Sequence, residues 1–312
     1  MCSHVSEQIK QIKQIKQMKQ MKQIKQMKQY KIFTILVLAM LVFSNANAEI
    51  KKFNMVFVPA SEKGDENDFV GLVNIINKLT GFEISFVKVT DYNAAVESMR
   101  AGRSHLAWYG GKTYIQASEI AGAEAFAAGV RPGEKNAGYY SYFVVRKDSD
   151  IKKFSDVRGK TLSLGNIGST SGDLIPQVEL AKIKISTTNK KDFKNVFYAG
   201  NHDACLLSVL NKQSDVCGMS SLNFSARLAD KTFKIEDVRI IHKSDLVPPP
   251  PLAYSNKVSS EDKKKIKDAV LDAHNHGTIG GYGGKMSHYI SVKDSDYDVL
   301  RKVSALLKKN KK

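Results

Sequence analysis

The sequence predicts an α/β protein with two lobes, each a mainly parallel sheet covered by helices, joined by two hinge strands. Three observations predict this fold. Strand-like apolar runs alternate with apolar residues at helical spacing, and the connections between them are short. The alternation runs from residue 53 to residue 128 and starts again near residue 161. Extended passages at 141–146 and 248–254, the second with four consecutive prolines, predict the hinge.

The elements expected in the first lobe alternate regularly between strand and helix. Strands are predicted at 53–58, 82–89, 105–109 and 123–128, and helices at 69–79, 91–99 and 113–120. Gly81 and Gly102 end the first two helices, and Asp91 caps the second. The short connections favour parallel pairing with the helices on the faces of the sheet.

The second lobe repeats this order and is followed by a C-terminal region. Strands are predicted at 161–164, 195–198, 216–219 and 238–242, and helices at 172–182, 202–210 and 222–228. After the second hinge, a charged helix at 260–274, a loose glycine-rich passage at 277–284 and a final helix at 297–307 are expected. The predicted divisions are a signal segment (1–48), lobe 1 (49–142), lobe 2 (143–247), and a return hinge with helices packing on lobe 1 (248–312).

The first 48 residues have the composition of an export signal. Residues 9–29 repeat Gln-Ile/Met-Lys with a period of three, which matches neither a helix nor a strand. An apolar run at 32–43 follows, and a small-x-small site ends at Ala48. A basic region, a short apolar run and such a site predict a cleavable signal peptide, cleavage after Ala48 and a periplasmic protein.

Charge and cysteine usage bear on the compartment and on the partners. The formal net charge is +17, and eight Lys and one acid in the first 48 residues contribute +7 of it. Export removes that basic repeat, so nucleic acid is not expected as a partner. A start at Met27 instead of Met1 would give a more compact signal. Cys205 and Cys217 remain after cleavage, and both a disulfide and two buried thiols agree with the sequence.

A glycine-rich turn with three consecutive hydroxyl residues lies at 165–176 (Gly-Asn-Ile-Gly-Ser-Thr-Ser-Gly-Asp-Leu-Ile-Pro). A strand-like run precedes it and a helix-like run follows. Glycine permits a tight turn, and Ser or Thr caps the helix, whose free amides carry partial positive charge. The turn therefore predicts a site for a tetrahedral oxyanion, with an ordinary capped helix as the alternative. It lacks the Gly-Lys-Ser/Thr of a Walker loop and the Gly-x-Ser-x-Gly of a hydrolase.

Other hydrogen-bond donors follow the ends of other predicted strands. In open α/β sheets, ligands collect at the carboxyl ends of strands, and an oxyanion requires donors. The strand-end groups are Asp91-Tyr92, Trp108-Tyr109-Gly110, Tyr139-Tyr140-Ser141 at the hinge, and Asn201-His202-Asp203. No Cys/His cluster has the spacing of metal ligands, so no metal is expected.

Several short motifs agree in order and spacing with one known family. They are Asp-Tyr at 91–92 with Glu-Ser-Met-Arg-Ala-Gly at 97–102, Ala-Trp-Tyr-Gly at 107–110, Tyr-Tyr-Ser at 139–141, Gly-Ser-Thr-Ser-Gly at 168–172 and Ala-Gly-Asn-His-Asp-Ala at 199–204. On these motifs, residues 53–275 resemble the phosphate, phosphite and phosphonate-binding proteins of ABC transporters. That family is a branch of the type II periplasmic binding proteins.

The resemblance implies a monomer without a cofactor that captures a small phosphorus oxyanion between two lobes and delivers it to a membrane permease. It implies that Ser169, Thr170 and Ser171 hold the phosphorus-bound oxygens. Tyr92, Tyr139 and His202 would complete the cage, with Tyr109, Gly168 and Gly172 as further possibilities.

Two departures from the family narrow the expected ligand. Members that bind an aminoalkyl phosphonate have carboxylates at the positions of Leu222 and Pro250, which pair with the ammonium. Without them, a buried ammonium would cost several kcal/mol. Phosphate, phosphite or an alkylphosphonate lacking an amine is therefore expected. A separate departure is Asp173, an acid in the first turn of the anion-binding helix. Its carboxylate should point away from the ligand, since it would otherwise weaken binding of the anion.

Two other functions remain open from the sequence. The protein could present its closed form to a receptor as a ligand sensor. A hydrolase using Ser169 or Ser171 with His202 and Asp203 is less favoured, because adjacent His and Asp make a triad geometry awkward.

Overall fold

The computed structural model describes residues 51–62 and 65–310, together with residues 18, 21, 22, 25 and 27. The apolar run and the cleavage site of the predicted signal peptide lie outside these residues. No helix in the described part of the chain combines the length and apolar character needed to cross a membrane.

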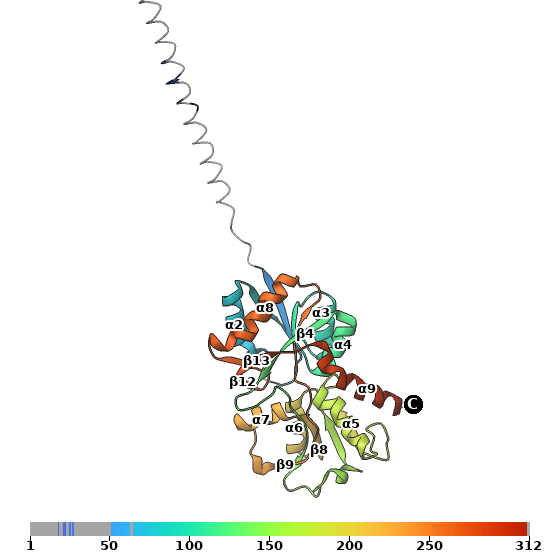
Figure 1. Ribbon diagram of the computed structural model, residues 1–312. Helices are drawn as coiled ribbons and strands as arrows, with labels where there is room; N and C mark the ends of the chain where they lie inside the picture. The colour runs from blue at the N-terminus through green and yellow to red at the C-terminus, as the bar shows by residue number, and fades with distance from the viewer. Residues whose placement is uncertain are drawn as a thin grey trace, which may run out of the picture. The chain divides into compact units, whose positions relative to one another are not determined.

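The first sheet is mixed, with the strand order β13-β4-β10-β3-β1-β2. Its strands are β1 (Lys52–Phe57), β2 (Glu83–Val87), β3 (Leu106–Trp108), β4 (Ala123–Val130), β10 (Leu252–Ser255) and β13 (His288–Ser291). Its helices are α2 (Glu66–Thr80), α3 (Tyr92–Arg100), α4 (Gly111–Ala121) and α8 (Ser260–Asp272), which surround the sheet in Figure 1. The β1, β2 and β3 strands are parallel, whereas β10 and β13 run antiparallel to their neighbours.

The second sheet has the order β7-β6-β8-β5-β9. Its strands are β5 (Ser141–Arg146), β6 (Thr161–Leu164), β7 (Asn195–Tyr198), β8 (Val216–Ser220) and β9 (Val238–Lys243), and its helices are α5 (Ile175–Lys182), α6 (His202–Leu210) and α7 (Ser221–Ala229). The β6, β7 and β8 strands are parallel, and β5 is antiparallel to both of its neighbours. The α/β class with two helix-covered sheets is as predicted. Each sheet is mixed, because β5 and β10, the first strands after the two crossings, and also β13 run opposite to the other strands of their sheets.

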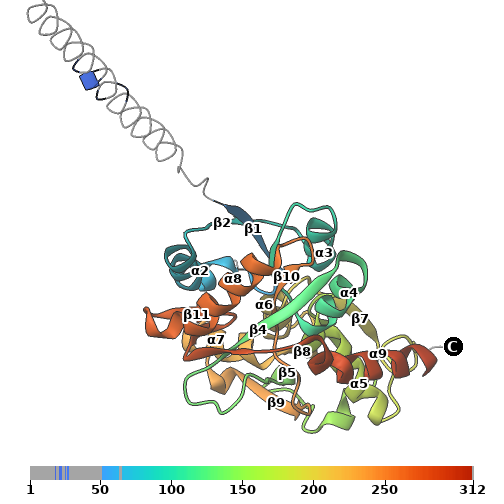
Figure 2. The same cartoon turned by 45° about the horizontal axis from the view of Figure 1, so that its top comes forward.

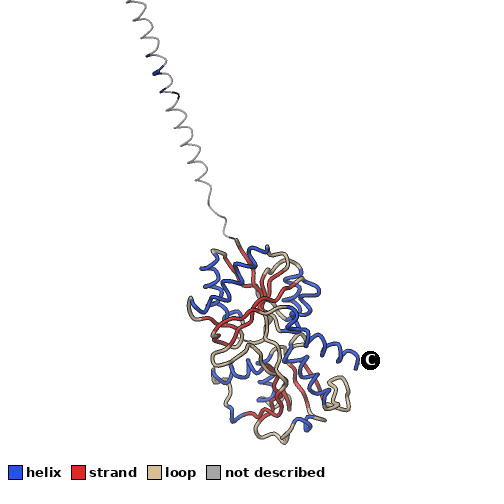
Figure 3. Tube along the Cα trace, viewed as in Figure 1, coloured by secondary structure: helices blue, strands red, loops and turns tan. Residues whose placement is uncertain are grey.

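Two segments carry the chain between the sheets, and they pair with each other. The chain passes from the first sheet to the second at 131–140 and returns at 244–251, and Figure 3 shows these loops between the two groups of strands. Tyr139 and Val247 form an antiparallel bridge, with Tyr139 N donating to Val247 O at 3.1 Å and the reverse bond at 2.8 Å. This bridge places Tyr139 at the junction of the two lobes.

The C-terminal region differs in part from the expectation. Residues 277–284 were expected to be loose, but β11 (Ile279–Gly281) pairs with β12 (Gly284–Met286), and β13 then joins β4. A Cβ on Gly280 would lie 2.1 Å from the Asp68 carbonyl oxygen, so the hairpin packs its bare backbone directly on α2. Helix α9 (Asp298–Asn310) contacts α4 of the first lobe and also α5 of the second (Figure 2).

Candidate functional site

The glycine-rich turn after β6 forms one wall of the candidate site. Ser169 caps it, since its Oγ accepts from the Gly172 N–H at 3.0 Å, and a single π-helical turn (η2, Thr170–Leu174) leads into α5. Turns of this kind are frequent at functional sites. Within the described part of the chain, the N–H groups of Thr170 and Ser171 have no recorded acceptor. Both amides are therefore available to an anion.

Two glycines of this turn permit close approach of aromatic rings. A Cβ on Gly168 would lie 2.5 Å from the Cβ of Tyr92. A Cβ on Gly172 would lie 2.8 Å from Cε1 of His202 and 3.0 Å from Oγ of Ser169. The two glycines thus make room for side chains of the site, and they contribute through their backbone alone.

Tyr92 reaches the turn from the first lobe. Asp91 caps α3 by accepting from the Ala94 N–H at 2.9 Å, and this cap fixes Tyr92 as the first residue of the helix. The Tyr92 ring is 2% exposed, and its hydroxyl lies close to the Ser169 side chain. Burial raises the pKa of Tyr92 well above its usual range, so the phenol stays protonated and can donate.

Tyr139 reaches the turn from the hinge. Its ring is buried, and its hydroxyl lies close to the side chains of Ser171 and Thr170. Burial raises the pKa of Tyr139 to about 12, against the opposing effect of these two hydroxyl groups. The Ser171 carbonyl in turn accepts from Ser141 Oγ at 2.7 Å, which ties the turn to the start of β5.

His202 is the first residue of α6, where Asn201 caps the helix by accepting from the Ala204 N–H at 2.8 Å. The Ser220 N–H donates to His202 Nδ1 at 3.2 Å, and His202 Nε2 lies 3.3 Å from Ser169 Oγ. Burial lowers the pKa of His202 to about 3, so the imidazole is neutral. Because Nδ1 accepts, the single ring hydrogen is on Nε2, and His202 is a donor toward the turn.

The structure therefore brings most of the sequence-predicted site residues together. We refer to these side chains as the donor cluster: Tyr92, Tyr139, Ser169, Thr170, Ser171 and His202. The Thr170 hydroxyl also has a structural role, because its Oγ1 accepts from the Lys112 N–H of the first lobe at 2.9 Å. Tyr109 lies outside the cluster, since its hydroxyl donates to the Ala95 carbonyl at 3.2 Å.

The carboxylate of Asp173 is held by three donors. Lys112 Nζ lies 2.6 Å from Oδ2, and Gln177 Nε2 and the Tyr198 hydroxyl donate to Oδ1 at 2.6 and 2.7 Å. These bonds compensate an acid whose side chain is 1% exposed in the first turn of an anion-binding helix.

Two buried residues near the donor cluster gave no signal in the sequence. Tyr282, in the turn between β11 and β12, packs against Trp108 with ring centroids 4.5 Å apart and the ring planes tilted by 36°. Its hydroxyl is near Ser220 but makes no satisfactory hydrogen bond within the described residues. Asp65, at the start of α2, accepts from the Ala60 and Ser61 amides at 2.6 and 3.1 Å, and burial raises its pKa to about 7.

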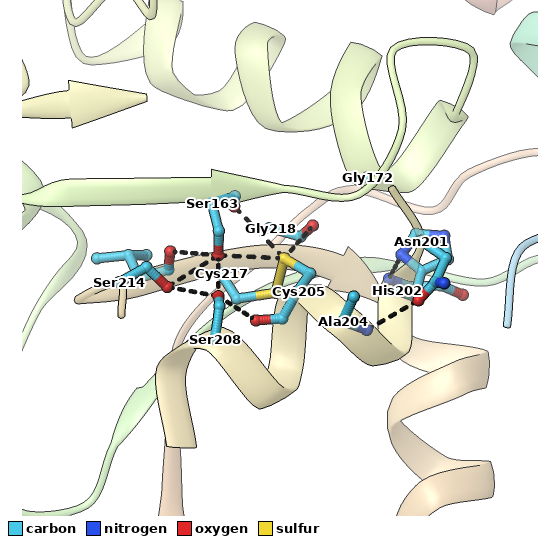
Figure 4. The surroundings of a disulfide bond; sticks show 12 residues. Ser163, Gly172, Asn201, His202, Ala204, Cys205, Ser208, Ser214, Cys217 and Gly218 are labelled. Carbon is cyan, nitrogen blue, oxygen red and sulfur yellow. Dashed lines mark hydrogen bonds between the residues drawn. A yellow bond between two sulfur atoms is a disulfide. The ribbon is translucent and has the colours of Figure 1, made fainter. Parts of the chain in front are cut away.

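A disulfide joins the helix that carries His202 to the strand that carries Ser220. Cys205 of α6 and Cys217 of β8 are bonded, with their Cα atoms 5.6 Å apart (Figure 4). The sequence left a disulfide and two thiols as alternatives, and the structure has the disulfide. Both cysteines are fully buried.

A cavity of about 250 Å³ adjoins the donor cluster, and we refer to it as the side cavity. It is shared by the two lobes and the hinge. Tyr139 and Tyr282 line it, and so do Leu222 and Pro250, the two positions at which the expected carboxylates are missing. No group of three or more metal-binding side chains occurs in the part of the chain that the structure describes.

The chain is similar to known proteins over most of its length. Residues 55–297 match the family model for the periplasmic substrate-binding protein of phosphonate ABC transporters. The chain is 30% identical over 239 residues to the phosphonates-binding periplasmic protein of Escherichia coli, covering 74% of this chain and 69% of that protein. It is 29% identical over 266 residues to the phosphate-import protein PhnD of Mycolicibacterium smegmatis, covering 79% and 83%.

Solved structures share the two-lobe fold. PhnD1 of Prochlorococcus marinus, solved in complex with methylphosphonate, superposes with a TM-score of 0.70 at 18% identity. The match covers 83% of this chain and 99% of that structure. The predicted periplasmic binding protein fold is thereby confirmed.

Proposed function

Because the chain belongs to the periplasmic substrate-binding proteins of phosphonate ABC transporters, we propose that its donor cluster binds a small phosphorus oxyanion without an amine. Phosphate, phosphite and simple alkylphosphonates are the candidate ligands. The bound ligand is delivered to an ABC permease, and the protein acts as an exported monomer after cleavage at Ala48. As a substrate-binding protein, the chain is a component of a transport system.

One observation carries the proposal for the site. The free amides of Thr170 and Ser171 lie in the same turn as three hydroxyl groups, beside two protonated phenols and a neutral imidazole that donates. All of these groups can donate, and a dianionic phosphoryl group has only acceptors. Charge-assisted hydrogen bonds contribute roughly 1.5–3 kcal/mol each. Five or six of them support a complex of about −8 kcal/mol, in the micromolar range, after ordering costs.

The lining of the side cavity favours a ligand without an amine. Leu222 and Pro250 line it, and neither can pair with an ammonium group. An ammonium placed there would lose its hydration without gaining a carboxylate, at a cost of several kcal/mol. We therefore expect 2-aminoethylphosphonate to bind more weakly than methylphosphonate, as calorimetry with both compounds would measure.

The geometry argues against a Ser/His hydrolase. His202 would have to accept a proton from Ser169 through Nε2, but that nitrogen already carries the ring hydrogen because Nδ1 accepts from the Ser220 N–H. Asp203 does not orient the ring, since its Oδ2 accepts from the Glu62 N–H at 3.0 Å. We infer a binding protein without hydrolase activity, and incubation of the purified protein with phosphonate and phosphoester substrates tests this by product release.

The central experiment is calorimetry of Ser169→Ala and Ser171→Ala with phosphate, phosphite and methylphosphonate. We expect each variant to bind the whole panel about tenfold or more weakly, since each loses a hydrogen bond to a charged group. Ser259→Ala is a matched control, because Ser259 also caps a helix by accepting from Asp262 N, at 3.1 Å, but lies on α8.

If neither site variant differs from Ser259→Ala across the panel, the proposed site is wrong. Uptake assays after deletion of the permease distinguish transport from sensing. Lost uptake of the bound anion supports delivery to a permease, and uptake that persists favours a sensor.

A further inference from the structure

The side cavity adjoins the donor cluster through one of its members, Tyr139. Tyr139 lines the cavity, and its hydroxyl lies close to the Ser171 and Thr170 side chains of the turn. Tyr282 also lines it, and the Tyr282 phenol lies near the phenols of Tyr92 and Tyr139. A phosphonate held by the turn would therefore direct its organic group into this cavity.

The cavity is larger than the smallest candidate ligands need. Its volume is about 250 Å³. A water molecule in the liquid occupies about 30 Å³, so this is room for roughly eight water-sized groups. A methyl group would leave most of the space to solvent, whereas a chain of several heavy atoms would fill it.

Two cations without carboxylate partners line the cavity. Arg131 is half-buried, and its Nη2 donates to the carbonyls of Gly283 and Tyr282 at 3.1 and 3.4 Å. Lys243 lies over the Tyr140 ring, with Nζ 3.6 Å from the centroid. Within the described residues, neither cation has a carboxylate oxygen within 4.0 Å.

The acidic groups near the cavity do not cancel these two charges. Glu134 is the acid among the lining residues, and it is exposed to solvent. Glu134 and Asp68 act on Arg131 only from beyond ion-pair distance. Among the residues that line the cavity, two cations and one solvated acid leave a net positive charge, and Asp68 acts on it only from outside the lining.

We propose that the side cavity binds the organic part of a phosphonate or phosphomonoester whose chain ends in a second anionic group, held by Arg131 and Lys243. This inference rests on the proposed function, since the turn must hold the phosphoryl end. The guanidinium retains donors that are not engaged by the two carbonyls, and these can receive a carboxylate. The apolar walls at Leu222 and Pro250 suit the methylene chain between the two ends.

The test compares phosphonates that differ at the distal end, by calorimetry on the mature protein. The probes are methylphosphonate, n-butylphosphonate, 3-aminopropylphosphonate, 3-phosphonopropionate and ethylene-1,2-bisphosphonate. We expect 3-phosphonopropionate or the bisphosphonate to bind at least tenfold more tightly than n-butylphosphonate, which fills the cavity without a charge. The two anionic probes distinguish a carboxylate end group from a second phosphonate.

Variants of the two cations assign the effect. Arg131→Gln and Lys243→Gln should each reduce the ratio of affinities between the anionic probe and n-butylphosphonate by about fivefold or more. Arg239→Gln is a matched control, because Arg239 also donates to two carbonyls, of Ile151 and Lys147, but does not line the cavity. Lys243 is exposed, so its variant tests the proposal even if Arg131→Gln destabilises the turn at Tyr282.

The outcomes separate this inference from the proposed function. If methylphosphonate and n-butylphosphonate bind but neither anionic probe binds more tightly, the inference is overturned and the phosphoryl site stands. If an anionic probe binds tightly and both cation variants retain its advantage, the assignment to Arg131 and Lys243 is wrong. If no phosphonate or phosphate binds at all, the proposed function itself fails.

Discussion

At the scale of single residues, burial changes the chemistry of two ionisable groups in opposite directions. His202 has its pKa lowered by burial to about 3, below the usual 6.5. Its neutral form therefore contributes stability that is present above pH 6.5 and is lost as the pH falls from 6.5 to about 3. Asp65 has its pKa raised by burial to about 7, from 3.8. Its contribution is fully present below pH 3.8 and is lost as the pH rises toward 7.

Asp65→Asn isolates the second effect. Asparagine keeps an oxygen that can accept from the Ala60 and Ser61 amides, but it cannot ionise. Between pH 5 and pH 8 we expect the free energy of unfolding of the wild type to fall relative to the variant by roughly 2–3 kcal/mol. Urea denaturation of the ligand-free protein across this range measures the difference, and the contribution of His202 cancels because both proteins contain it.

Asp148→Asn serves as the control for this measurement. The side chain of Asp148 accepts hydrogen bonds from Arg146, and these lower its pKa. Asp148 is ionised in both the folded and the unfolded protein above pH 5. The difference in free energy of unfolding between Asp148→Asn and the wild type should therefore not change with pH. An equally flat difference for Asp65→Asn would show that Asp65 ionises normally in the folded protein.

The sequence predicted the residues of the donor cluster better than the residues that surround it. Tyr92 and His202 stand directly after helix caps at strand ends, a local pattern that a sequence displays. Whether they contact a ligand stays a prediction. Asp65 lies in a polar, charged run that resembles an exposed loop, and its burial depends on contacts that no local pattern encodes. Tyr282 lies among glycines, and this segment has no apolar periodicity from which the burial of Tyr282 could be predicted.

At the scale of elements, the disulfide holds together two elements that position one side chain. His202 begins α6 and Ser220 ends β8, and the Cys205–Cys217 bond joins this helix to this strand (Figure 4). The Ser220 N–H bond to Nδ1 fixes which nitrogen of His202 carries the hydrogen. We infer that the disulfide also keeps His202 a donor toward the turn.

Replacing both cysteines tests this coupling. For Cys205→Ser with Cys217→Ser, we expect a loss of about 2–4 kcal/mol in the free energy of unfolding, typical of a removed disulfide. Affinity for the bound oxyanion should also fall severalfold, because α6 can shift relative to β8. Urea denaturation and calorimetry measure the two effects.

A core variant away from the site separates positioning from general destabilisation. Val145→Ala in β5 removes buried apolar volume from the same lobe without touching α6. If this variant weakens binding as much as the double cysteine variant at equal loss of stability, the disulfide has no specific role in positioning His202.

Whether a segment forms a helix or a strand was largely predictable from the sequence, whereas the direction in which neighbouring strands pair was not. The helix after the turn was expected from its hydroxyl cap, and Ser169 provides that cap. The π-helical turn, however, depends on contacts with Lys112 and Tyr139 from outside the lobe. Strands β11 and β12 have three residues each and are rich in glycine. They therefore lack the alternation of apolar and polar residues by which strands are recognised in a sequence.

At the scale of the whole described unit, the lobes contact each other directly around the donor cluster. Lys112 of the first lobe pairs with Asp173 and also donates to the Ile167 carbonyl. Thr113 Oγ1 donates to the Gly168 carbonyl at 2.8 Å, and the His202 N–H donates to the Ala60 carbonyl at 3.1 Å. These bonds join the lobes independently of any ligand, so they bias the protein toward its closed form.

The motif order along the chain made two lobes and a hinge predictable from sequence. These particular bonds were not predictable, since Lys112 and Asp173 are 61 residues apart and belong to different lobes. Asp173 was expected to point away from the ligand, and its three donors account for how a buried acid is tolerated there. Because Lys112 and Asp173 belong to different lobes, separation of the lobes would break their pair, so we infer that the acid takes part in the closing equilibrium.

Lys112→Met tests that role at the level of the whole molecule. The substitution keeps the backbone donor to Thr170 but removes the ammonium, leaving Asp173 with Tyr198 and Gln177. We expect the closed form to lose about 1–2 kcal/mol, so the dissociation constant should rise roughly five- to thirtyfold, mainly through faster release. Stopped-flow release and calorimetry measure this, and small-angle scattering of the ligand-free variant should show a larger radius of gyration.

Lys182→Met is the matched control for Lys112→Met. Lys182 also forms ion pairs, with Glu179 and Asp245, but these carboxylates belong to its own lobe and to the returning hinge. Its loss should leave ligand release unchanged, because opening of the lobes does not break this pair. Equal release rates for the two variants would mean that the Lys112–Asp173 contact stabilises only the local turn. Faster release from Lys112→Met alone would identify the contact as part of the closing equilibrium, with the buried acid as its partner.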